Sequence, residues 1–304
     1  MHYRPTSQRF VNFWNAAQLI SPLMIGVSAN SPLLLGRRLW QETRVPLFCQ
    51  SIDGRSEGAG TRCPPPRVNF GQGWLRHSAL ELFREAVQLY PPLIPLVSEE
   101  DPVSVVAAGG TPKLEELCLH EGTIWSWNRP IYDPGDDPHL RIEMRALPAG
   151  PSAADMAANA ALFIGLSQGL AEDIDPLLSA LPFSCARANF YRAAQSGLKA
   201  SIYWPDAHQN GLLEQPLAQV LEELLPTAAR GLTHIGVTEA EVARWLNLIG
   251  ERLQSRQTGA SWQLRQYNRL LGKGFSVEDA CHHLLAGYCA FSQDNIPVAR
   301  WTDL

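Results

Sequence analysis

The chain has 304 residues, 45% of them hydrophobic and 18% charged, which is the composition of an ordinary soluble globular protein with room for a large buried core. Its formal net charge of −5 argues against a general nucleic-acid binder, because such proteins carry a basic excess.

The first half of the chain predicts helices, strands and loops in mixed order. Residues 7–20 carry apolar side chains at helical spacing, and "LMIGVSA" at 23–29 is predicted as a buried strand. A Gly- and Pro-rich loop over 53–73 precedes an amphipathic helix over 74–90 and an irregular stretch over 91–112.

Two adjacent antiparallel strands are predicted over residues 122–147. The first, "GTIWSWNRPIY", ends at Pro130, and "DPGDDP" is a turn cluster. The second begins in "HLRIEMRALPAGP", 139–151, which alternates strictly. On a strand of period two, one face carries His139, Arg141, Glu143 and Arg145, and the other carries Leu140, Ile142, Met144 and Ala146.

The second half is mostly helical. Ser152 and Thr238 each precede an acidic residue by three positions, the pattern of a capping box at a helix start. The first of these helices runs to about residue 171, and the second covers "VARWLNLIGERL". Four further helices are predicted near 185–197, 215–230, 260–271 and 276–290. An order in which strands lie mainly in the first half of the chain and helices follow in the second half favours an α+β fold. We expect a single domain over 1–304, with a strand-rich part at 1–150 and a mostly helical part at 151–304.

The charged face of the 139–146 strand suggests chemistry. A carboxylate is a hard oxygen ligand for Mg²⁺, and arginines neutralise phosphoryl oxygens. Glu143 between Arg141 and Arg145 therefore fits a site for a phosphate and a divalent cation. The alternative is a sheet with one solvated face, on which alternating charges are common.

Three other stretches carry candidate residues. In "SANSPLLLGRRLWQETR", 28–44, the small polar Asn30 and Ser31 can present amides and a hydroxyl to a ligand, and arginines follow. "HEGTIWSWNR", 120–129, contains Thr123 and Arg129, which need partners if they are buried. "MHYRP" places His2 beside the first residue, a position that by itself indicates nothing.

Several functional classes lack their signals. The six cysteines are scattered without a CxxC pair, so they give neither a zinc spacing nor a disulfide framework, and we expect a cytoplasmic protein. No run reaches the roughly 18 apolar residues of a membrane span. Pro22 and the polar residues before it argue against a signal peptide at 19–27. The sequence has no GxSxG, HExxH, P-loop or GxGxxG motif.

Taken together, "HEGTIWSWNR" and "RIEMRALPAGP" resemble the glutamate–cysteine ligase family, in its branch of plant-type and proteobacterial ligases and bacterial carboxylate–amine ligases. Three further stretches fit that family in order, namely "HYRPTS", "SANSP" followed by a glycine and by Arg44, and "NFYRAAQSGL" at 189–198. The stretch "TGASWQ" at 258–263 fits more loosely. The resemblance runs from residue 2 to about residue 200.

The resemblance implies a fold related to glutamine synthetase, with a curved, mostly antiparallel sheet that holds ATP and Mg²⁺. It implies that ATP drives the joining of a carboxylate to an amine through an acyl phosphate, as in glutathione biosynthesis. By position, Glu143 and His2 would be metal ligands and Arg145 would contact the transferred phosphoryl group. Arg44, Thr123 and Arg129 would lie near the amino-acid substrate or the nucleotide phosphates, beside Asn30, Ser31 and Arg141.

One departure from the family leaves two functions open. Family members carry further metal-binding carboxylates on strands before the His-Tyr strand, and this chain starts at that strand, as a C-terminal portion would. The first function is a ligase acting on small amino-acid substrates, and the sequence leaves open whether this chain is active without those strands. The second is a non-catalytic nucleotide- or amino-acid-binding or assembly protein on the same fold. An unrelated α+β protein with a solvated strand face is the third interpretation. We expect no membrane or nucleic-acid partner, and the sequence leaves a homo-oligomer open.

Overall fold

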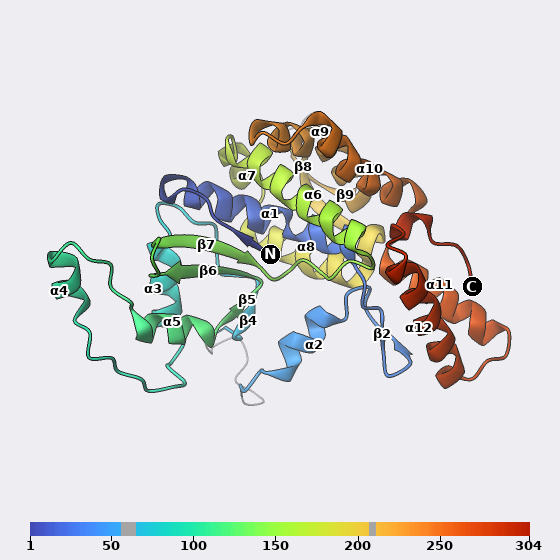
Figure 1. Ribbon diagram of the computed structural model, residues 1–304, viewed down its shortest axis with the longest axis horizontal. Helices are drawn as coiled ribbons and strands as arrows, with labels where there is room; N and C mark the ends of the chain where they lie inside the picture. The colour runs from blue at the N-terminus through green and yellow to red at the C-terminus, as the bar shows by residue number, and fades with distance from the viewer. Residues whose placement is uncertain (56–64, 207–210) are drawn as a thin grey trace. The chain divides into compact units, whose positions relative to one another are not determined.

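The protein is a mixed α+β chain, described in a computed structural model over residues 1–55, 65–206 and 211–304 (Figure 1). It divides into two compact units that interleave along the sequence. Unit 1 comprises residues 1–15 and 47–145, and unit 2 comprises residues 16–46 and 146–304. The second half is mostly helical, as the sequence predicts. The expectation of a strand-rich part over 1–150 is wrong, because its described residues contain more helix than strand.

Unit 1 contains a three-stranded antiparallel sheet in the order β1-β7-β6. Its strands are β1 (His2–Tyr3), β6 (Asn128–Asp133) and β7 (His139–Met144). The predicted pairing over 122–147 is confirmed, with Arg129 opposite Glu143 and Asp133 opposite His139. The first strand is wrong in its boundaries, because it breaks at Trp127 and β6 continues through Pro130 to Asp133.

The other elements of this region are short. They are α2 (Arg44–Ser51), β4 (Val68–Asn69), α3 (Leu80–Leu89), α4 (Pro102–Ala107), α5 (Glu115–Gly122) and β5 (Trp125–Ser126). β4 and β5 pair in parallel. The helix predicted over 74–90 starts later, because the Glu81 carboxylate accepts hydrogen bonds from the backbone N–H groups of Arg76, His77 and Ser78 and holds them in a turn.

The strand predicted at 23–29 is wrong, because this segment belongs to α1 (Phe10–Ser28). Every residue from Phe13 to Ala29 is buried, and a helix buried on all sides shows no amphipathic period. The apolar run therefore carried no local signal to distinguish a helix from a strand. Together with the preceding turn, Ser7–Ser28 is long and apolar enough to cross a membrane, but 89% of its most apolar window is buried inside the structure, as in the core helix of a soluble protein.

Unit 2 is built around long helices, whose predicted positions are confirmed to within a few residues. They are α6 (Ala153–Ala171), α8 (Phe183–Ser196), α9 (Leu217–His234), α10 (Glu239–Ser255), α11 (Gly259–Gly272) and α12 (Val277–Gln293), with the short α7 (Asp175–Ala180). Two hairpins complete it, β2 (Leu33–Leu34) with β3 (Arg37–Arg38), and β8 (Ser201–Asp206) with β9 (Gly211–Pro216). The sequence did not predict either hairpin.

Helices α6 and α9 cross at backbone contact through glycines. A methyl group on Gly231 would lie 2.0 Å from the carbonyl oxygen of Gly165 and 2.7 Å from the backbone nitrogen of Gly169. Backbone atoms cannot move aside as the end of a flexible side chain can. The two helices can therefore approach this closely only where the side chains are absent.

We expect Gly231→Ala to lower the free energy of unfolding by about 1–3 kcal/mol, the usual cost of overpacking. The matched control is Gly250→Ala in α10, where nothing lies within 4 Å of the added methyl group. Since alanine is the better helix former by roughly 0.5–1 kcal/mol, this control should be neutral or stabilising. Equilibrium urea unfolding measures both, and equal effects of the two substitutions would contradict the contact.

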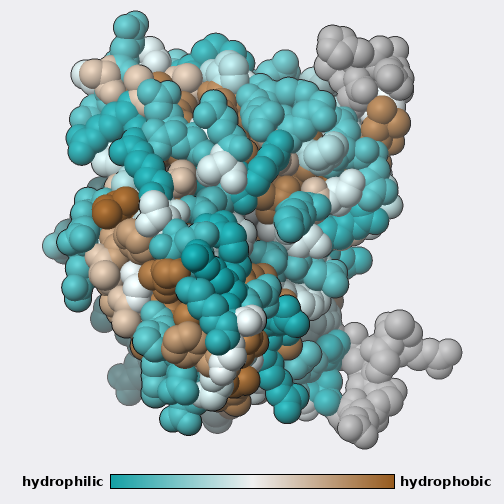
Figure 2. Space-filling model, turned by 90° about the vertical axis from the view of Figure 1, so that its right-hand side faces the viewer, coloured by the Kyte–Doolittle hydropathy of each residue, from teal (hydrophilic) through white to brown (hydrophobic). Residues whose placement is uncertain are grey.

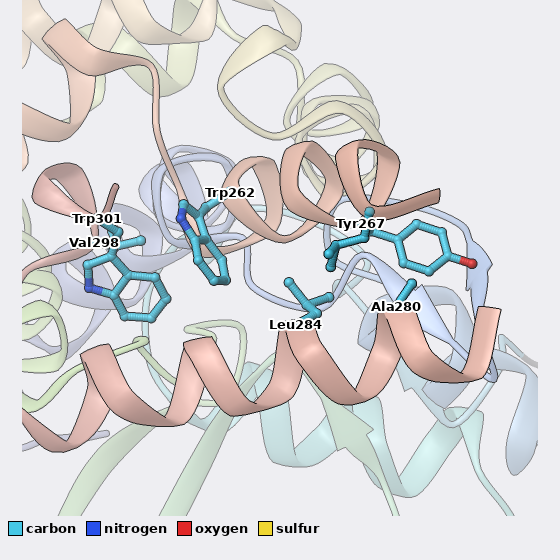
Figure 3. Close-up of a cluster of buried hydrophobic side chains, with 7 residues drawn as sticks. Trp262, Tyr267, Ala280, Leu284, Val298 and Trp301 are labelled. Atoms are coloured by element: carbon cyan, nitrogen blue, oxygen red, sulfur yellow. The ribbon is translucent and has the colours of Figure 1, made fainter. Parts of the chain in front are cut away.

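Helices α11 and α12 enclose a core of their own with the C-terminal segment (Figure 3). Its buried members are Trp262, Tyr267, Leu270, Ala280, Leu284, Val298 and Trp301. The ring centroids of Trp262 and Trp301 are 4.9 Å apart in an edge-to-face arrangement, which is favourable for aromatic pairs. This cluster fixes α12 against α11.

Candidate functional site

The predicted charged face of the β1-β7-β6 sheet exists in unit 1. Ile142 and Met144 are buried, each 1% exposed, while the alternating polar residues of β7 are half-buried. The strand register places both His2 and Arg129 directly opposite Glu143. Three of the predicted residues therefore form one row across three strands, and Arg145 follows at the end of β7.

Glu143 is held by two guanidinium groups. Its Oε2 lies 3.1 Å from Nε of Arg145 and 3.5 Å from Nη1 of Arg129. Burial by itself would raise the pKa of Glu143, but the hydrogen bond and charge of Arg145 and the charge of Arg129 lower it below its usual value. The carboxylate is therefore ionised at neutral pH and offsets part of the positive charge of the two arginines.

Arg141 forms the other half of this face. Its Nη1 donates to the Asp133 carboxylate and lies 3.0 Å from Nε2 of His139, and its Nε donates to Nδ1 of His2 at 3.2 Å. Burial lowers the pKa of His2, and the charge of Arg141 acts in the same direction. A neutral imidazole is the form that accepts this hydrogen bond. The sequence did not single out Asp133, which fixes Arg141 from β6.

A buried acid beside this face was missed at the sequence level. Glu121, the last residue but one of α5, is 6% exposed, and within the described part of the chain its Oε1 has no hydrogen-bond partner. Burial raises its pKa to about 7, against the charge of Arg129 and with that of Glu85. The only sequence signal is its place in "HEGTIW", because nothing local shows that this carboxyl is buried.

The raised pKa of Glu121 predicts a pH dependence of stability. The folded protein keeps the proton up to about pH 7, whereas an unfolded glutamic acid loses it near its ordinary value of about 4.3. Stability should therefore fall as the pH rises between these two values. We expect Glu121→Gln to be roughly neutral at about pH 4 and to stabilise the protein by on the order of 1–3 kcal/mol at about pH 8.

Urea unfolding of this variant at the two pH values tests the prediction. The control is Glu115→Gln on the same helix, where the side chain is exposed and its ion pair with Lys113 is long, at 3.8 Å. A pH-independent effect of Glu121→Gln, or the same effect in both variants, would show that burial does not perturb this carboxyl.

A second group of predicted residues lies in unit 2. The Glu42 carboxylate, 1% exposed, accepts a hydrogen bond from Nε of Arg44 at 3.0 Å and one from the backbone N–H of Asn30 at 2.9 Å. The Ser31 hydroxyl accepts from the backbone of Arg44 at 3.3 Å, and Nη2 of Arg44 donates to the Ala146 carbonyl at 2.8 Å. Asn30, Ser31 and Arg44 are therefore brought together, and Glu42, which the sequence did not indicate, holds them.

Thr123 belongs to neither group. Its hydroxyl donates to the His120 carbonyl at 2.8 Å and accepts from Nη1 of Arg67 at 3.0 Å. Other stretches that carried the resemblance have structural roles. Asn189 hydrogen-bonds the backbone of Tyr203, and Thr258 caps α11.

The donor set for a metal is small. The described residues contain no group of three or more His, Cys, Asp or Glu side chains placed to hold a metal ion. Glu143 and His2 offer two donors in register, but Mg²⁺ prefers six oxygen ligands. Glu143 is also engaged by two arginines. These residues therefore do not form a complete metal site by themselves.

The fold and this site define an α+β protein with an Arg–Glu–Arg cluster on one face of an antiparallel sheet. Its sequence matches the model of glutamate-cysteine ligase family 2 (GCS2) over residues 4–269. The chain therefore belongs to this family of ligase-type proteins, as its motifs predicted. A search of curated proteins found no match.

Proposed function

We propose that this protein is an ATP-dependent carboxylate–amine ligase of the glutamate–cysteine ligase type, on a fold related to glutamine synthetase. The family match over residues 4–269 supports a ligase. The observation that supports a particular site is the half-buried Arg–Glu–Arg cluster of Arg129, Glu143 and Arg145. Guanidinium groups in such a setting bind phosphate through charge-assisted hydrogen bonds.

The reaction has two steps. The substrate carboxylate attacks the γ-phosphorus of ATP, which forms an acyl phosphate and releases ADP. The deprotonated amine of the second substrate then attacks the acyl carbon, which forms the amide and releases phosphate. In this scheme Arg145 stabilises charge on the transferred phosphoryl group. Arg129, Arg141, Arg44, Thr123, Asn30 and Ser31 are the candidates for holding the nucleotide or the amino acid.

Glu143 and His2 are the candidate ligands for the Mg²⁺ that accompanies ATP. Mg²⁺ commonly takes only one or two protein carboxylates and completes its shell with phosphate oxygens and water. Phosphate oxygens and water would have to complete the shell, because the described residues do not form a complete site.

The test is ATP-dependent phosphate release by the purified chain, screened over pairs of amino acids with mass-spectrometric detection of the amide. We expect phosphate and amide to appear in equal amounts and only when both amino acids are present. Phosphate release without any amide, for every pair, would reject ligation.

A non-catalytic nucleotide- or amino-acid-binding or assembly protein is the second candidate. It is favoured by the engagement of Glu143 with two guanidinium groups, because a carboxylate that is held in ion pairs is less available to bind a catalytic metal ion. ATP binding measured by calorimetry, with no turnover for any amino-acid pair, would support it over the ligase.

The setting that we propose is the cytoplasm, with small-molecule amino-acid substrates and without nucleic-acid or membrane partners. The acidic net charge of −5 supports the exclusion of nucleic acid. Assembly into a homo-oligomer is an additional proposal that sedimentation can test.

A further inference from the structure

An apolar groove lies on unit 1, between the end of α3, the segment 91–97 and α5. Its volume is about 500 Å³, and most of its lining residues are aliphatic residues and prolines. Every residue of the segment 91–97 is exposed. Five aliphatic residues of the groove expose large fractions of their surface: Val87 61%, Leu93 55%, Ile94 54%, Leu96 46% and Val97 86%. An exposed apolar area of this kind marks an interaction site.

The residues that follow the groove segment form an arm, residues 98–116, which carries α4 at its far end, away from β6 and β7 (Figure 1). Two hydrogen bonds close the base of the arm. The backbone N–H of Lys113 donates to the Glu100 carboxylate at 2.6 Å, and the backbone N–H of Ser98 donates to the Glu116 carboxylate at 2.5 Å. A surface loop whose ends are joined in this way is a compact structure. The arm therefore presents α4 as a preformed element.

Helix α4 has an apolar ridge, formed by Val103 and Val106. The two valines are three residues apart, so they lie on the same side of the helix, and they are 77% and 59% exposed. Asp101 caps the helix by accepting a hydrogen bond from the backbone N–H of Val103 at 3.2 Å. Because a helix of six residues is marginal in water without packing on its apolar side, covering the ridge would stabilise the arm.

We propose that two copies of this chain associate through their arms, with the ridge of each copy packed in the groove of the other. Because every copy carries both a ridge and a groove, the contact is reciprocal and closes as a two-fold symmetric dimer. This interface gives the homo-oligomer proposed above a particular face. It does not depend on the proposed ligation.

The exposed area suits a dimer. At roughly 150–180 Å² for a fully exposed Val, Leu or Ile residue, the five groove residues and the two ridge residues expose about 700 Å² per copy, and about 1,400 Å² in two copies, against the roughly 1,200–2,000 Å² that a specific, stable interface buries. A small apolar ligand in the groove would leave both ridges in water. A second copy covers the ridge and the groove together, which favours it as the occupant.

Sedimentation velocity of the purified chain over a range of concentrations tests the proposal. We expect a dimer of twice the 33.6 kDa chain mass that dissociates on dilution. Val103→Asp on the ridge and Leu93→Lys in the groove should each raise the dimer Kd about a hundredfold or more, because each places an unpaired charge in an apolar contact twice per dimer. Both residues are more than half exposed in the single copy, so the fold should persist, and circular dichroism checks it.

The matched control is Leu285→Asp on α12, in unit 2. Leu285 is 60% exposed, as much as the ridge residue Val106. Figure 2 views the molecule from the side on which α11 and α12 lie and shows hydrophobic areas interrupted by hydrophilic ones. This substitution should leave the dimer Kd unchanged. A chain that stays monomeric at its highest soluble concentration would overturn the proposal. A dimer that neither arm substitution weakens would support the homo-oligomer and reject this interface.

Mixing the two arm variants shows whether a ridge binds a groove. In a dimer of either variant alone, both contacts contain an unpaired charge. In the mixed dimer, the Leu93→Lys chain supplies an intact ridge to the intact groove of the Val103→Asp chain, and the other contact pairs opposite charges. We therefore expect the mixture to contain more dimer than either variant at the same total concentration. If the mixture is no more dimeric than the separate variants, the ridge does not pack in the groove and the proposal is rejected.

Discussion

Replacing Asp155 by alanine is expected to lower the free energy of unfolding by about 3–5 kcal/mol, because it breaks a buried ion pair from one side. Asp155 and Arg252 are each 1% exposed, and their side chains meet at 2.8 Å. The same carboxylate accepts hydrogen bonds from the Ser152 hydroxyl at 2.7 Å and the backbone N–H of Val298 at 3.0 Å. The substitution would leave the guanidinium of Arg252 charged and buried without its counter-ion.

Equilibrium urea unfolding followed by circular dichroism and by tryptophan fluorescence measures this effect, and agreement of the two curves checks two-state behaviour. The control is Glu251→Ala, which removes a surface ion pair to Arg300 with two contacts of 2.7 Å. Such exposed pairs contribute about 0–1 kcal/mol. If both substitutions lower the free energy of unfolding equally, the buried ion pair contributes no more to stability than the exposed one.

Arg145→Ala is expected to lower kcat of the proposed ligation by about 10²–10³, the range found when one donor to a developing negative charge is removed. Arg145 is well placed for this role, because its guanidinium is about one-fifth exposed and lies 3.1 Å from Glu143 at the end of β7. The thermal midpoint should change little, since this face is not part of the apolar core. A solvated, non-functional face predicts no loss of activity.

The control for this second prediction is Arg4→Ala. Arg4 also pairs with a carboxylate in unit 1, that of Asp137, but its side chain is about half exposed and lies outside the row that faces Glu143. Steady-state phosphate release with ATP at several concentrations separates kcat from KM. Equal kcat values for the two variants would show that Arg145 takes no part in the reaction.

Of the capping box predicted at Ser152, only one of the two hydrogen bonds is present, and the other shows what a local sequence pattern cannot predict. The Ser152 hydroxyl accepts from the backbone N–H of Asp155 at 3.1 Å, as predicted, so the helix start was readable from the sequence. Asp155, however, does not return a bond to the cap backbone. It turns to Arg252, 97 residues away, and no local pattern could predict that partner.

The sequence by itself determined the features that depend on neighbouring residues. Strict alternation places the charged residues of 139–145 on one face, because successive side chains of a strand point to opposite sides. The helix starts at Ser152 and Thr238 follow from side chains that satisfy backbone N–H groups three residues ahead. The ordered motifs also identified the family.

Only the tertiary structure decided which distant groups meet and which are removed from water. It makes residues 23–28 part of a helix, because burial on every side of α1 erases the period that sequence patterns depend on. It buries Glu121 beside Arg129 and raises its pKa, and it joins Asn30 to Gln263 and Tyr288 across more than 230 residues. Burial and long-range hydrogen bonds arise from the packing of the whole chain, so no short stretch of sequence encodes them.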